Sequence, residues 1–68
     1  MTKDELILLC KRENVRNLAG IYRRIRSLYS AYYELSRGAP RPEMKPALSQ
    51  IMDTMNALMD AKAYYKPD

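Results

Sequence analysis

The chain has 68 residues, enough for one domain with barely sufficient apolar surface for a stable core. Its single cysteine excludes an internal disulfide, and the absence of histidine removes the commonest metal ligand. Small chains without such staples usually gain stability from a second subunit or a partner. The net charge of +4 is uneven: residues 1–42 carry nine basic and four acidic residues, whereas residues 43–68 carry three and four.

The sequence contains no stretch that approaches the roughly 18 apolar residues of a membrane span. The apolar run 6–10 is too short for the core of a signal peptide, and Asp4 and Glu5 precede it where basic residues are required. A single cysteine also suits a reducing compartment. We therefore expect a cytoplasmic protein without membrane association.

The first predicted helix covers residues 3–13. Thr2 and Glu5 have the spacing of a capping box, which marks a helix start. The run 6–10 that follows turns through more than a full circle, so it must be buried between two elements or lie at an interface. Asn14 favours a break after Glu13, because asparagine is a poor interior residue and a good cap. The alternative is one unbroken helix from Thr2 to Arg37.

The central predicted helix, residues 15–37, has two contrasting faces. Gly20 interrupts neither pattern, and together with Ala19 it makes a thin place where another backbone can approach. Arg37 and Gly38 resemble a helix end, with a cation in the last turn and a residue suited to a left-handed cap. Its apolar positions recur at steps of three and four, with three further residues widening the seam: Leu18, Ile21, Ile25, Leu28, Tyr32 and Leu35, then Val15, Tyr22 and Tyr29.

The last predicted helix covers residues 44–65, after a turn over 38–42 that Pro40 and Pro42 stiffen. Its seam, interrupted only by Lys62, comprises Leu48, Ile51, Met52, Met55, Leu58, Met59 and Tyr65. Its outer side is sparsely charged: Ser49, Asn56, Ala57, Ala61 and Ala63, with Asp53 and Asp60. The short turn makes the two long helices antiparallel neighbours. We therefore predict an all-α fold, an antiparallel helical hairpin plus a short N-terminal helix, completed as a small bundle by self-association.

Catalytic and metal chemistry find little support in the sequence. It contains no Gly-rich phosphate loop, paired-cysteine spacing or nucleophile elbow. Asp53 and Asp60 are seven residues apart, about 10.5 Å along a helix, which is too far to share a proton or one metal ion. Cys10 lies in an apolar run, where a thiol is inert. We therefore expect no enzyme, no cofactor and no bound metal.

The basic face of the central helix is the most informative surface. Arginine offers a planar fork to carboxylate and phosphate, and a neighbouring tyrosine adds an aromatic surface. The predicted partner-binding residues are Arg12, Arg16, Arg23, Arg24, Arg26, Tyr33 and Arg37. Such a face suits an acidic protein surface or, by salt-dependent contacts, a nucleic acid. The plain alternative is a solvated outer face without a specific role.

The layout of two amphipathic helices around a short turn resembles two unrelated sorts of small protein. One comprises the dimeric RNA-binding hairpins of plasmid copy control, and the other the small co-chaperones of type III secretion. The turn 36–40, Ser-Arg-Gly-Ala-Pro, is similar in style to that of the co-chaperones. The likeness covers the turn and the helical pattern and transfers no functional residue. The leading expectation is a small non-enzymatic regulator or adaptor that binds a partner protein and forms a homo-oligomer or an obligate complex; the alternative is a nucleic-acid binder.

Overall fold

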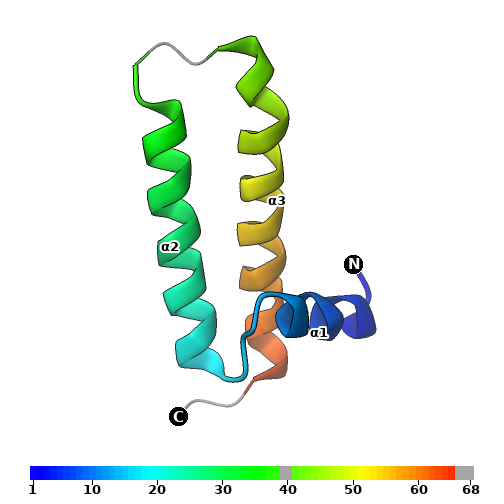
Figure 1. Cartoon of the computed structure of the whole chain (residues 1–68). Helices are drawn as coiled ribbons and strands as arrows, with labels where there is room; N and C mark the ends of the chain where they lie inside the picture. Colours follow the sequence, from blue (N-terminus) through cyan, green and yellow to red (C-terminus); the bar gives the residue numbers. More distant parts are fainter. Residues whose placement is uncertain (39–40, 66–68) are drawn as a thin grey trace.

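The computed structural model describes residues 1–38 and 41–65, and every regular element in these ranges is helical. The three α-helices are α1 (Lys3–Arg12), α2 (Leu18–Ser36) and α3 (Lys45–Ala61). Single 3-10 turns, Pro42–Met44 and Lys62–Tyr64, flank α3. In Figure 1, α2 and α3 lie side by side and run in opposite directions, while α1 crosses the lower part of α3. The prediction of an all-α fold with three helices is confirmed.

Helix α1 has the start that the sequence predicts. The Thr2 hydroxyl accepts a hydrogen bond from the Glu5 amide at 3.3 Å, and the Thr2 amide donates to the Glu5 carboxylate at 3.2 Å. These bonds to Thr2 hold the pKa of Glu5 below its ordinary value. The capping box therefore satisfies two of the amides that a helix start leaves free.

Helix α1 ends in a left-handed turn at Asn14, whose φ is 59°. The Val15 amide donates to the Cys10 carbonyl at 2.8 Å, and the Asn14 amide donates to the Lys11 carbonyl at 3.1 Å. This pair of bonds is the Schellman arrangement, in which asparagine is the usual substitute for glycine. Val15 and Cys10 are both buried, which supplies the apolar contact that accompanies the motif. The predicted break after Glu13 is confirmed, and the unbroken helix is wrong.

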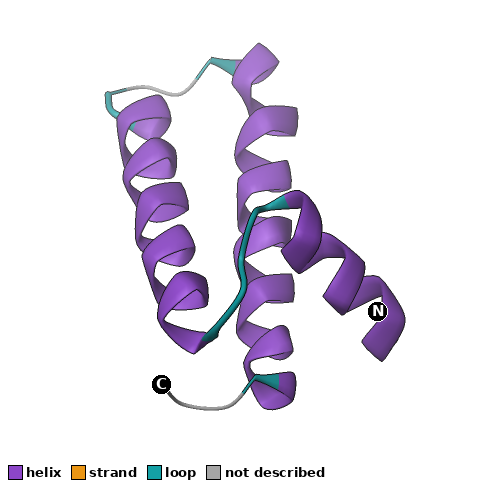
Figure 2. Cartoon of the chain, turned by 60° about the horizontal axis from the view of Figure 1, so that its bottom comes forward, coloured by secondary structure: helices purple, strands orange, loops and turns teal. Residues whose placement is uncertain are grey.

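The boundaries of α2 differ from the prediction at one end. The helix begins at Leu18, not at residue 15, because Asn17 is extended and its side chain accepts a hydrogen bond from the Gly20 amide at 2.7 Å. Residues 15–17 therefore form a connection, which Figure 2 shows as an extended segment between α1 and α2. At the other end Arg37 is the C-cap and Gly38 has a φ of 77°, as the sequence predicts. Pro40, which was expected to stiffen the turn, lies outside the described residues.

The core is built where α3 meets the two other helices. Helix α2 contributes two buried residues to this core, whereas α3 contributes five, the largest share. Leu18, Ile25, Ile51 and Tyr65 are partly buried against this cluster. The buried apolar residues are Leu6, Leu9, Cys10, Val15, Ile21, Leu28, Leu48, Met55, Ala57, Leu58 and Ala61.

The narrow apolar seams are confirmed, and Val15 is buried in the connection, but the predicted widening by large side chains along the two long helices is wrong. Tyr22 and Tyr29 of α2 and Met52 and Met59 of α3 are exposed. Each lies at the edge of a seam, on a flank that neither neighbouring helix covers. Only a third helix on that side would bury them.

Helix α1 instead covers part of the side of α3 that the sequence predicted to be its sparsely charged outer side. Ala57 and Ala61, predicted on the sparsely charged outer side, are buried. Small side chains let α1 approach closely at this place. Leu6 and Leu9 face the core, whereas Leu8 is 60% exposed. The apolar run 6–10 is thus partly buried between elements within one chain.

Replacing Leu28 by alanine should lower the free energy of unfolding by about 2–5 kcal/mol, because it removes a buried side chain and leaves a cavity. Ser30→Ala, at an exposed position of the same helix, is the matched control and should change it by less than about 0.5 kcal/mol. Urea unfolding followed by circular dichroism measures both. Equal effects would show that the faces of α2 are assigned wrongly.

Candidate binding surface

One face of α2 carries exposed cations and an exposed tyrosine, and we call it the basic strip: Arg23, Arg26, Tyr33 and Arg37. The spacings of three, seven and four residues return to nearly the same side of a helix, and the strip is about 21 Å long. Ala19 and Ser30 are exposed on the same side and leave the surface between the arginines low. A flat partner surface can therefore reach several of these side chains together.

Three of the predicted residues lie elsewhere. Arg12 ends α1 and Arg16 lies in the connection, so neither belongs to the face of α2, although both are exposed. Arg12 would extend the strip only in one unbroken helix, so the break between α1 and α2 separates it from the face of α2. Arg24 is half-buried and points toward α1, because one residue step turns its side chain by about 100° from that of Arg23.

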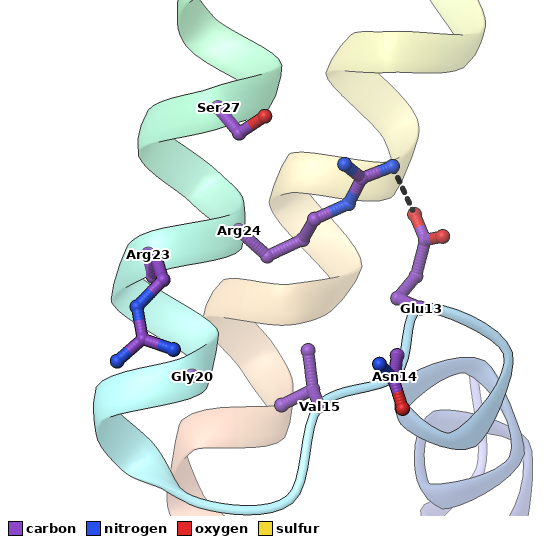
Figure 3. A pocket seen from close by; sticks show the side chains of 7 residues that line it. All are labelled: Glu13, Asn14, Val15, Gly20, Arg23, Arg24 and Ser27. Atoms are coloured by element: carbon purple, nitrogen blue, oxygen red, sulfur yellow. Dashed lines mark ion pairs between the residues drawn. The ribbon is translucent and has the colours of Figure 1, made fainter.

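Arg24 belongs to a hollow of about 290 Å3 between α2 and the connection. Figure 3 shows its guanidinium reaching across to Glu13, with Nη2 and Oε1 3.5 Å apart. Arg23 also lines the hollow, so the hollow adjoins the basic strip. The full lining is Glu13, Asn14, Val15, Gly20, Arg23, Arg24 and Ser27.

Two details of the hollow follow from close packing. A Cβ at Gly20 would lie 3.1 Å from the Asn17 side-chain oxygen and 3.6 Å from Cγ1 of Val15. The thin place predicted at Gly20 is thus where the connection passes against α2. The Nε of Arg24 is buried and has no hydrogen-bond partner among the described residues.

The acidic residues and the cysteine form no comparable site. Asp53 and Asp60 are exposed, and the described part of the chain holds no group of three or more potential metal-ligating side chains. Cys10 is fully buried. The pKa of the nearby Tyr65 is raised, mainly by the Cys10 thiol and secondly by burial. This pair therefore belongs to the packing of α1 against the end of α3.

The comparisons add no relative to this picture. No family model matches the chain, and no significant match was found among curated proteins or among solved structures. The resemblance to copy-control hairpins and secretion co-chaperones therefore remains a likeness of layout. No helix in the described ranges has the length and hydropathy needed to span a bilayer.

The contact between Glu13 and Arg24 was not visible from the sequence. The two residues are eleven apart, and the turn at Asn14 that brings them together also creates the hollow. The asparagine was the only available signal. It marked the break but not the direction in which the chain leaves it.

Arg24→Gln should lower the free energy of unfolding by about 0.2–1 kcal/mol, since the pair with Glu13 is partly exposed, at 38% and 21% for the two side chains. Arg26→Gln, two residues away on the basic strip, should leave it unchanged within about 0.5 kcal/mol. Thermal unfolding of both variants tests this division between a structural and a surface arginine. A larger loss for Arg26→Gln would contradict it.

Proposed function

We propose that the chain is a small non-enzymatic regulator or adaptor of the cytoplasm, an αα-hairpin with a closing helix, which binds an acidic surface of a partner protein. The basic strip on α2 carries this proposal. Its four side chains are exposed and contribute nothing to the core. Their one ion pair in the described residues joins Arg37 to Glu34 at 3.8 Å, with both side chains largely exposed. A contact of this kind contributes little to stability, so it leaves Arg37 available to a ligand.

The make-up of the strip favours a protein partner over a nucleic acid. Three arginines over about 21 Å supply few phosphate contacts, and nucleic-acid affinity depends on their number. Arg24 is already paired with Glu13. Ser30 and Tyr33 lie between the arginines and Ala19 precedes them, which makes a low and neutral surface suited to side-chain packing.

A nucleic acid is the second candidate, favoured by the combination of arginine and Tyr33 on one face. The two readings differ in their salt dependence. Duplex DNA held by three phosphate contacts should lose affinity with a slope of about −2.7 in a plot of log K against log salt. A fluorescent duplex and a single strand, titrated at several salt concentrations, measure this slope.

Replacing Arg23, Arg26 and Arg37 together by glutamine should abolish partner binding without unfolding the chain. Glutamine keeps helix propensity and removes three charges. The partner is first captured from the source cells, with and without nuclease, and its affinity is then measured by calorimetry. We expect at least a tenfold loss for the variant and a wild-type affinity that falls with added salt.

The matched control replaces Lys11, Arg41 and Lys45 by glutamine, which removes the same charge from exposed positions off the strip. It should change the affinity less than twofold. Equal losses of affinity in the two triple variants would show that binding depends on net charge and not on the basic strip. Unchanged binding by the strip variant would place the working surface elsewhere, and capture that requires intact nucleic acid would favour the second candidate.

A further inference from the structure

Besides Tyr33 of the basic strip, four large apolar side chains lie exposed on the two long helices. The exposed fractions are 47% for Tyr22, 64% for Tyr29, 41% for Met52 and 47% for Met59. The members of each pair are seven residues apart, so each pair makes a stripe along its helix. Neither stripe belongs to the core or to the basic strip.

Both stripes lie on the face of the helix pair that is turned away from α1. On α2, Gly20, Arg24 and Ser27 line the hollow beside the end of α1. Tyr22 is two residues from Gly20 and from Arg24, and Tyr29 is two residues from Ser27. Two residues turn a side chain by about 200°, so the tyrosines point to the opposite side.

The same relation holds on α3. Thr54 and Ala57 lie beside Leu9 of α1, with which they line a second hollow. Met52 is two residues before Thr54, and Met59 is two residues after Ala57. The methionines therefore also point away from α1, by about 200°. The two helices thus present one face that carries both stripes.

A contact between the helices fixes the heights of the stripes. The Lys62 ammonium lies 5.0 Å from the centre of the Tyr22 ring, so these two residues are at about the same level. The helices run in opposite directions (Figure 1), so counting from this contact at about 1.5 Å per residue puts Met59 near the level of Ile25 and Met52 near the level of Tyr32. Along the helix axes the four side chains therefore follow in the order Tyr22, Met59, Tyr29 and Met52, in steps of about 4.5–6 Å.

We infer that this face binds a second copy of the chain, related by a two-fold axis parallel to α2 and α3. Such an axis keeps every residue at its height and lays α2 of one copy on α3 of the other. Met59 of the second copy then enters between Tyr22 and Tyr29, and Tyr29 enters between the two methionines. The tyrosine and methionine stripes interlock as ridges and grooves.

Charge complementarity supports this pairing. Arg26, the member of the basic strip nearest to the tyrosines, lies on the outer edge of the tyrosine stripe, and Asp60 follows Met59 on the outer edge of the methionine stripe. At the inferred heights the two are within about one turn of each other across the rim, and both are exposed. A two-fold axis perpendicular to the helices would instead set α2 against α2 and place basic strips side by side, which like charges oppose.

The size of the face also fits. The molecule measures 39 by 22 by 16 Å, so its broadest projection is about 860 Å2, which is of the order of the roughly 800 Å2 that each partner buries in a standard interface. The tyrosine and methionine side chains make the face largely apolar, with the Lys62 ammonium over the Tyr22 ring at one end and Arg26 and Asp60 at the outer edges. The arrangement completes a four-helix core with one α1 on each outer side.

Sedimentation equilibrium of the full chain between 1 and 100 µM tests the inference in the absence of any partner protein. We expect a species of twice the 7.9 kDa chain mass. Met59→Lys should raise the dissociation constant at least tenfold. Leu8→Lys is the control, since Leu8 is also exposed but lies on α1, off this face. It should leave the dissociation constant of the dimer unchanged.

A charge exchange tests the axis. Arg26→Asp and Asp60→Arg should each weaken the dimer at least threefold, and the double variant should return to within twofold of the wild type. Circular dichroism of each variant confirms that it is folded. A folded 7.9 kDa species alone at 100 µM, or a dimer sensitive to Leu8→Lys and not to Met59→Lys, overturns the interface. Additive losses in the double variant overturn the two-fold arrangement.

Discussion

The fold depends on the way α1 turns back at Asn14 and packs on α3. The left-handed asparagine and the bonds from Val15 and Asn14 to the end of α1 make this turn possible. Packing then buries Leu6, Leu9 and Cys10 against the small side chains of Ala57 and Ala61. Without this contact, a pair of helices would have an apolar flank open on either side. In a chain of 68 residues, such a loss would remove a large part of a marginal stability.

Because α1 occupies one flank, it decides what each remaining surface can do. The basic strip points away from the core and takes part in no packing, so its arginines can change without loss of the fold. The face opposite α1 keeps its tyrosines and methionines exposed. Arg24 shows the difference clearly. It is only one residue from Arg23, but its side chain turns toward Glu13 and forms an ion pair that links α2 to the end of α1. We therefore separate arginines that form such a link from arginines that are free to bind.

Helical periodicity and cap chemistry predicted most of the fold. Thr2 and Glu5 gave the start of α1, Asn14 its end, and Gly38 the end of α2. The errors about burial have one common cause, the position of α1. An apolar run such as 6–10 has no single face, so it does not show which flank of α3 it will cover. The burial of Ala57 and the exposure of Tyr22 both follow from that choice. The strip on α2 was predictable from spacing alone, whereas the pairing of Arg24 required the geometry of the turn.

Nuclear Overhauser spectroscopy of the labelled chain tests the packing of α1 most directly. We predict cross-peaks between the methyl groups of Leu9 and Ala57, and between Cys10 and the ring of Tyr65. The amide proton cross-peaks of an unbroken helix should be interrupted between Glu13 and Leu18. A continuous series of amide contacts from residue 3 to residue 37, without contacts between α1 and α3, would contradict the account. The core, the hollow and the exposed face opposite α1 would then all have to be assigned again.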